Sequence, residues 1–271
     1  MISIVIVSYN TRELLRACLN SLRAYAPEAE VIVVDNASND GSAEMVASDF
    51  PEVKLLAQDV NHWYCGGNNI GAAAAVGRCV LFLNPDTVVT QGAVQAMAAF
   101  LEAHPDYAGV TCQLRYPHGG IQQTCSKRLS FAYLLGMFTP LVLLPGIAPA
   151  LRRRFWYTDW ARDTDRDVEA APGSCLMLRR EDARMDADLL LYFPEDALAE
   201  RLQRPFRFLG SVTIEHHEKS STMNWRATRV FFRDLMTYTR RYHGAWQAAL
   251  LWPGAHLLMG LMWLRRRAVR R

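Results

Sequence analysis

A short apolar run that ends in Asn-Pro-Asp constrains the fold of this chain more than any other feature. The run, Val80 to Leu83, is too short for a helix and is typical of a strand buried on both faces. Pro85 fixes its own φ and biases Asn84 away from helical geometry, so Asp86 should follow the carboxyl end of the strand. Open α/β sheets bind ligands at that end, although an Asx-Pro-Asp sequence alone is also a common turn.

Two apolar strands upstream end in polar residues in the same way. The expected elements are a strand at Ser3–Ser8, a helix at Arg12–Tyr25, a strand at Glu30–Asp35, a helix from Ser42 to about Phe50 and a strand at Val53–Ala57. This alternation predicts a parallel sheet with right-handed crossovers. The strand ends Ser8-Tyr9-Asn10, Asp35-Asn36 and Asn84-Pro85-Asp86 should therefore form one rim.

The stretch Asn61 to Gly71 is polar, aromatic and rich in glycine. We expect a loop here that leads into a helix of small residues, Ala72 to Gly77. Gly66-Gly67 permits close approach of a ligand, and Asn68-Asn69 can cap a helix whose N-terminus favours an anion. A tight loop with purely structural caps explains the same residues.

The second half of the chain continues the alternation. Its expected elements are a helix at Gly92–His104, strands at Ala108–Cys112, within Ala171–Arg180 and at Phe206–Ile214, and helices at Ala197–Gln203 and Trp225–His243. Glu195 and Asp196 precede one of these helices, where N-capping is an alternative to catalysis. His216 and His217 follow a strand, and such a pair is more often solvated than bound to a metal.

Composition narrows the class of protein. The chain has 271 residues, 51% of them hydrophobic and 21% charged, which excludes a disordered chain and a polytopic membrane protein. Eight arginines lie in two clusters, Arg152 to Arg154 and Arg265 to Arg271, and without them the net charge of +3 becomes 3 − 8 = −5. The basic patches are therefore local, which argues against a general nucleic-acid binder.

Cysteine usage and the N-terminus indicate the compartment. The six cysteines are scattered without a CxxC pair, so we expect reduced thiols. The first strand begins at once, without the basic start and cleavage site of a signal peptide. Both features predict a cytoplasmic protein.

Seven motifs occur in an order that resembles the family 2 glycosyltransferases with the GT-A fold. They are SIVIVSYN, VIVVDNASNDGS, GGNNIGAA, LFLNPDT, GSCLMLRRE, YFPED and HHEKSS, and they cover about residues 1 to 221. Each motif alone is weak evidence, but seven in the family's order are specific. Within the family the chain looks most like bacterial rhamnosyltransferases that extend lipid-linked surface polysaccharides.

The resemblance implies a role for each matching residue. The nucleotide-sugar would be held by Ser8, Tyr9, Asn10, Asp35, Asn36, Asn68, Asn69, Asn84 and Asp86. A divalent metal, Mg²⁺ or Mn²⁺, would be held by Asp86 with His216, and His217 is the alternative ligand. Asp196 would be the general base, with Glu195 in support.

Two segments depart from the family pattern. Arg184 to Leu189 replaces a Gly-Gly-Phe-Asp-like turn, and Ala197-Leu198-Ala199 replaces Val-Asp-Leu after the acidic pair. The Asn-Pro-Asp element also keeps only one carboxylate, Asp86, for the metal. These departures concern the acceptor side and the metal, while the order of motifs is intact.

The expected function is an inverting, single-displacement transfer of a sugar from a nucleotide-sugar to a lipid-linked or polysaccharide acceptor, and the resemblance makes rhamnose the candidate sugar. A nucleotidyltransferase is the first alternative, but no glycine-rich loop with a lysine follows the first strand. A nucleotide-sugar-binding protein without transfer activity is the second, although Asp86 and Asp196 are both present.

Residues 1–221 should form the GT-A domain and residues 222–271 a helical tail at the membrane interface. Trp246 to Leu264 is apolar, contains Pro253-Gly254 and ends at an arginine cluster. Phe131 to Pro149, broken by prolines and followed by Arg152 to Arg154, repeats that order. Because arginines beyond a spanning segment would oppose the positive-inside rule, we expect peripheral contact with the anionic inner face of the plasma membrane. A buried core or a dimer interface would also explain both segments.

Overall fold

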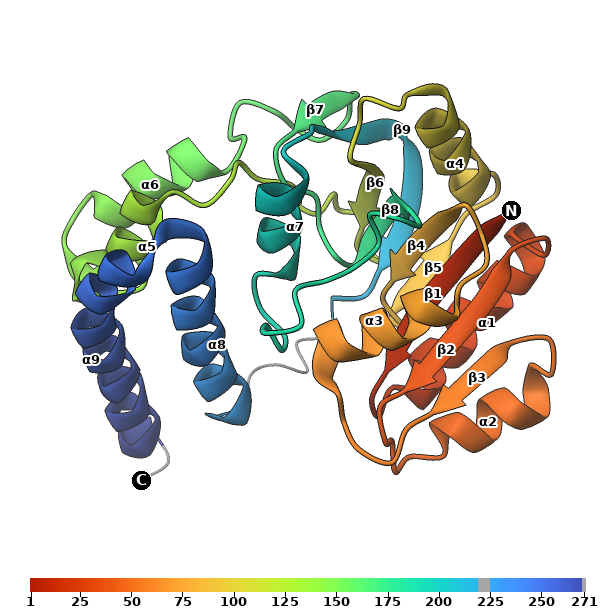
Figure 1. Cartoon of the computed structure of the whole chain (residues 1–271), viewed down its shortest axis with the longest axis horizontal. Coiled ribbons are helices and arrows are strands. Elements are labelled where there is room, and N and C mark those ends of the chain that lie inside the picture. Colours follow the sequence, from red (N-terminus) through yellow and green to blue (C-terminus); the bar gives the residue numbers. More distant parts are fainter. Residues whose placement is uncertain (219–224, 270–271) are drawn as a thin grey trace.

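The computed structural model describes residues 1–218 and 225–269. Its centre is a nine-stranded sheet in the order β3-β2-β1-β4-β8-β6-β9-β5, with β7 paired to β9 (Figure 1). The strands are β1 (Ile2–Ser8), β2 (Glu30–Asp35), β3 (Lys54–Ala57), β4 (Cys79–Leu83), β5 (Thr87–Val89), β6 (Gly109–Arg115), β7 (Arg166–Val168), β8 (Cys175–Arg179) and β9 (Phe206–His216). Six strands run in one direction and β5, β7 and β8 run the other way, so the predicted, mostly parallel sheet is confirmed.

Helices cover both faces of this sheet. They are α1 (Arg12–Tyr25), α2 (Ser42–Asp49), α3 (Trp63–Ala74), α4 (Ala93–Ala103), α5 (Phe131–Met137), η1 (Pro140–Leu143), α6 (Ile147–Phe155), α7 (Pro194–Leu202), α8 (Trp225–Tyr238), η2 (Thr239–His243) and α9 (Ala245–Val269). Alternate side chains of β1 enter two separate cores: Val5 belongs to a cluster that contains residues of α3 and α7, whereas Ile4 and Ile6 belong to one that contains residues of α1, α2 and α4. The α/β class predicted from the alternation is therefore confirmed.

The glycine-rich stretch is helical, which corrects the predicted loop at Asn61 to Gly71. Helix α3 begins at Trp63 and ends at Ala74, not at Gly77 as predicted. A Cβ on Gly71 would lie 2.3 Å from Val5 Cγ1, and one on Gly67 would lie 2.7 Å from Val7 Cγ1. The glycines therefore serve close packing of α3 on β1, a need that outweighs their poor helix propensity.

The apolar segment that we predicted to be interrupted by prolines does not form one continuous helix. Phe131 to Pro149 forms α5, the 3₁₀ turn η1 and the start of α6. Helix α9 continues through Pro253 to Val269. Among the described helices, none is both long enough and apolar enough to cross a bilayer.

The C-terminal helices share the main core. Phe232, Leu235 and Tyr238 of α8 and Leu251 of α9 are buried in the same cluster as Phe206 of β9. The predicted division at residue 221 falls in the gap at residues 219–224, outside the described residues, and stays a prediction. Side chains of the second arginine cluster, residues 265–271, also lie outside the description.

Candidate functional site

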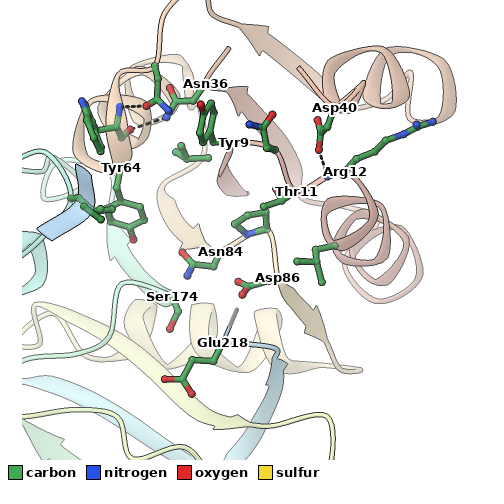
Figure 2. A pocket seen from close by; sticks show the side chains of 18 of the residues that line it. Tyr9, Thr11, Arg12, Asn36, Asp40, Tyr64, Asn84, Asp86, Ser174 and Glu218 are labelled. Carbon is green, nitrogen blue, oxygen red and sulfur yellow. Dashed lines mark hydrogen bonds between the residues drawn. The ribbon is translucent and has the colours of Figure 1, made fainter. Parts of the chain in front are cut away.

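One large cavity lies where β1, β2 and β4 end. These parallel strands are neighbours in register, with Ser8 opposite Asp35 and Val5 opposite Phe82, so their carboxyl ends form one rim, as predicted. The cavity measures about 1410 Å³. Figure 2 shows Asn84, Asp86 and Ser174 close together on one side of it and Tyr9, Thr11 and Asn36 on the other.

The loops that follow β1 and β2 are tied to each other. The Asn10 backbone N–H donates to Ser38 Oγ at 2.9 Å, and the Asn39 N–H donates to the Asn10 side chain at 2.9 Å. Asp35 is 2% exposed; its Oδ2 accepts from the Ser38 N–H, but its Oδ1 is buried with no hydrogen-bond partner in the described structure. A buried unpaired carboxylate oxygen is costly unless a donor reaches it.

Asp86 and His216 face each other across β5 and β9. Asp86 Oδ1 lies 3.3 Å from His216 Nε2, because β5 begins at Thr87, which pairs with His216 in the antiparallel register. Gln122 Nε2 donates to the His216 carbonyl oxygen at 2.7 Å, which leaves Gln122 Oε1 as the acceptor 2.8 Å from His216 Nδ1. The neutral tautomer that satisfies Gln122 carries its proton on Nδ1, so Nε2 presents a lone pair to the Asp86 carboxylate.

Two acceptors at that distance require a proton or a cation between them, and the pair therefore fits a divalent metal. His217 turns elsewhere: its Nε2 lies 3.0 Å from Glu215 Oε1. Among the described residues, no group of three or more His, Cys, Asp or Glu side chains could hold a metal. A cation bound by Asp86 and His216 would thus keep most of its coordination positions for the ligand.

Glu195 reaches the cavity from the first turn of α7. Its carboxylate accepts the backbone N–H of Gly173, and burial raises its pKa from 4.5 to about 6. The approach is close, since a Cβ on Gly173 would lie 2.0 Å from Glu195 Oε1. Tyr64 Oη donates to the Gly173 carbonyl oxygen at 2.7 Å and so holds the same loop.

Asp196, the next residue, is not among the described residues that line the cavity. Its pKa lies well above the usual range because of burial, and also because of the negative charge of Glu195. Successive helical residues point about 100° apart, so Glu195 can face the cavity while Asp196 points away from it. Of this half-buried acidic pair, only Glu195 is thus among the described lining residues of the cavity.

Helix α8 braces the loop in front of Glu195. Asp234 is fully buried, and its Oδ2 accepts three successive backbone N–H groups, those of Leu190, Leu191 and Tyr192, at 3.1, 2.9 and 3.0 Å. Leu191 lines the cavity. The position of the loop therefore depends on the C-terminal helices.

Three polar residues predicted to bind the nucleotide-sugar are engaged in the fold. The Ser8 hydroxyl is 2.9 Å from Thr11 Oγ1, Asn68 Nδ2 donates to the Tyr64 carbonyl oxygen, and Asn69 exchanges two hydrogen bonds with the Met185 backbone. They are absent from the described lining of the cavity. That they also contact the ligand stays a prediction.

The cavity also contains residues that the sequence did not single out. Trp63, Tyr64, Ser174, Glu218 and Arg226 line it, and the Arg226 guanidinium lies 4.7 Å from the Trp63 ring centroid. The aromatic pair before the glycines was a usable signal. Arg226 comes from an amphipathic helix far along the chain, and nothing in its local pattern marks it.

Comparisons with known proteins agree with this geometry. A rhamnosyltransferase of Mycobacterium tuberculosis, named N-acetylglucosaminyl-diphospho-decaprenol L-rhamnosyltransferase, is 24% identical over 93% of this chain and 88% of its own length. The mannosyltransferase PcManGT of Pyrobaculum calidifontis, solved with GDP-Man and Mn²⁺, has a TM-score of 0.57 at 17% identity over 94% of this chain and 69% of that one. Residues 1–349 of S. aureus TarS, solved with UDP-GlcNAc, have a TM-score of 0.56 at 16% identity, over 89% of this chain and 67% of that one; this chain spans 40% of full TarS.

These structural neighbours have the GT-A fold, which this chain shares. The family model for glycosyl transferase family 2 matches residues 3–184, a span that includes β1 to β4, Asp86 and Gly173. The chain belongs to glycosyl transferase family 2.

Proposed function

We propose that this enzyme transfers a sugar, with rhamnose as the first candidate, from a nucleotide-sugar to a polyprenyl-diphosphate-linked acceptor with inversion at the anomeric carbon. The observation that carries the proposal is one cavity that contains both the Asp86–His216 pair and Glu195. The names of two relatives support the substrates: one is a rhamnosyltransferase for a diphospho-decaprenol acceptor, and another was solved with GDP-Man.

Asp86 and His216 would hold Mg²⁺ or Mn²⁺. Such a cation supplies charge stabilisation for a departing diphosphate. Asn84, at the end of β4, and Arg226, on α8, add polar and positive groups to the same cavity. Tyr9, Asn10 and Asn36 line the cavity after the ends of β1 and β2. Asp35, the last residue of β2, lies outside the described lining, and its buried Oδ1 suits a hydroxyl or N–H donor of the nucleotide.

Glu195, and not Asp196 as the sequence suggested, is the general base in this proposal. The acceptor hydroxyl gives its proton to the Glu195 carboxylate, its oxygen forms a bond to the anomeric carbon, and the bond from that carbon to the diphosphate oxygen breaks. The nucleoside diphosphate leaves with the electron pair. A carboxylate with a pKa of about 6 is ionised at neutral pH and is still basic enough to take the proton.

The acceptor's lipid places the reaction at a membrane. We extend the proposal to a peripheral enzyme on the cytoplasmic face of the plasma membrane, where a polyprenyl diphosphate is presented by the bilayer. The exposed Arg154 of α6 and the exposed apolar residues of α9 support this location.

Release of nucleoside diphosphate from a panel of nucleotide-sugars, with and without polyprenyl-diphosphate acceptor, tests the proposal. We expect Asp86→Ala and EDTA to abolish transfer, and Glu195→Gln to lower it by about 10²- to 10⁴-fold. Glu44→Gln, which removes an exposed carboxylate on α2, is the control and should transfer normally. Full transfer in EDTA would exclude the metal, and a larger loss in Asp196→Asn than in Glu195→Gln would return the role of base to Asp196.

A further inference from the structure

A second cavity, of about 390 Å³, lies between α5 and α6 and is separate from the catalytic one. Three of its lining residues are cations, Lys127, Arg128 and Arg154, and one is an acid, Glu169. The Tyr133 and Phe155 rings stack at 4.2 Å and form part of its wall. The cavity is therefore lined by aromatic rings on part of its wall and carries a net positive charge.

The charged groups of this cavity are only partly neutralised within the described structure. Glu169 Oε2 accepts the backbone N–H of Arg128 at 3.0 Å. Arg128 Nη1 donates to Gln203 Oε1 at 2.6 Å, while its Nε is buried without a hydrogen-bond partner. Lys127 and Arg154 are exposed, and no described ion pair engages either side chain. Donors of this kind are suited to the oxygens of a phosphate.

An apolar surface adjoins this cavity. Phe131, next to the lining residues Ser130 and Ala132, contacts the Trp246 ring at 6.2 Å between centroids. Gly254 of α9 lies against Thr139, so α9 packs on the start of η1. Figure 1 shows α5, α6 and α9 together at the end of the molecule opposite α1 and α2.

Exposed large hydrophobic residues are concentrated on this surface. Ten of the fifteen found among the described residues lie on α9 or between residues 141 and 144: Leu141, Leu143, Leu144, Trp246, Leu250, Trp252, Leu257, Leu261, Met262 and Leu264. Five of those on α9 recur at intervals of three, four or seven residues and form one stripe. We call these ten residues the apolar face. Tryptophan, leucine and flanking arginine together are typical of a helix that lies in a lipid interface.

We propose that the cavity between α5 and α6 binds the phosphate of a membrane lipid whose chains contact the apolar face. This inference depends on the proposed function in one respect, which is that the substrate is expected to be carried by a membrane. The lipid is an anionic phospholipid of the bilayer, and the diphosphate of the acceptor, which offers the same chemistry, is the alternative outcome that the test distinguishes. Phosphate groups lie just outside the hydrocarbon, which is where a basic cavity beside an apolar face would meet them.

Vesicle flotation of the full-length protein tests this with charge-matched variants. Lys127→Glu with Arg154→Glu changes the cavity, whereas Arg152→Glu with Arg153→Glu makes the same charge change on exposed residues of α6 outside the lining. Three vesicle preparations are compared. The first contains phosphatidylcholine alone, the second contains phosphatidylcholine with phosphatidylglycerol, and the third contains phosphatidylcholine with a polyprenyl diphosphate. We expect the cavity variant to bind anionic vesicles about tenfold or more weakly than wild type, and the control to lose much less.

The preparation in which the cavity variant loses binding identifies the source of the phosphate. Equal losses in the two double variants would mean diffuse attraction and would overturn the proposal, as would full binding by the cavity variant. Leu143→Ser with Leu144→Ser should also weaken flotation, whereas Val60→Ser with Val76→Ser, at exposed positions elsewhere, should not. Thermal melting of every variant checks folding. Donor turnover is measured separately, so wild type that floats without turnover refutes the proposed function and leaves this inference standing.

Discussion

Replacing Glu195 with glutamine should remove activity and make the protein more stable at neutral pH. Glutamine keeps an oxygen for the Gly173 N–H and removes the charge that burial disfavours. A catalytic carboxylate held at a raised pKa costs stability, because the folded protein must keep it ionised in a poorly solvated place. The variant therefore separates the proposed role of Glu195 as base from the cost of its buried charge to stability.

The size of the effect follows from the pKa. In the unfolded chain the carboxyl titrates near 4.5, and in the folded protein near 6. Between these values the folded state holds a proton that the unfolded state has lost, so stability falls as pH rises through this window. The shift of 6 − 4.5 = 1.5 is worth about 2 kcal/mol at most, and partial contact with cavity water reduces it to about 1–2 kcal/mol.

Urea denaturation of wild type and Glu195→Gln at two pH values measures this difference. At pH near 8 the variant should be more stable by about 1–2 kcal/mol, and near pH 4 the two proteins should unfold alike. Transfer by wild type should fall as pH drops through about 6, since protonation removes the base. A variant no more stable at high pH, or a wild type with full transfer at pH 5, would refute the reasoning.

Two further substitutions test how the site is supported. Asp234→Ala would remove the buried carboxylate that accepts three backbone N–H groups of the loop; we expect about 3–5 kcal/mol lower stability in urea and weaker transfer. Unchanged values for both would show that Asp234 does not hold the loop. Gly71→Ala places a Cβ 2.3 Å from Val5 Cγ1 and should cost about 1–3 kcal/mol, whereas Gly260→Ala on α9, where nothing lies within 4 Å, should be neutral or slightly stabilising. Equal stabilities of these two glycine variants would contradict the close packing of α3 on β1.

The sequence alone determined the outline of the catalytic half. Apolar runs of four to six residues that stop at polar residues predict buried parallel strands, and the carboxyl ends of neighbouring parallel strands must meet at one edge. Asn10, Asn36, Asn84 and Asp86 could therefore be placed on one rim without coordinates, and all four line the cavity. These patterns involve residues that are close together in the chain, so a single sequence is enough to identify them.

Only the tertiary structure decided between neighbouring residues of similar chemistry. His216 and His217 look alike in the sequence, but antiparallel pairing of β9 with β5 turns one toward Asp86 and the other toward Glu215. Side chains alternate between the two faces of a strand, so the pairing alone makes the choice.

The same holds for the acidic pair and for the glycines. Glu195 faces the cavity and Asp196 does not, because the entry of α7 is set by a loop that Asp234 holds from α8, some forty residues further along the chain. The glycines between Asn61 and Gly71 indicated a loop, whereas contact with Val5 and Val7 of β1 made them part of a helix. Contacts between segments distant in sequence decide which of several equivalent local patterns is used, and no local pattern contains that information.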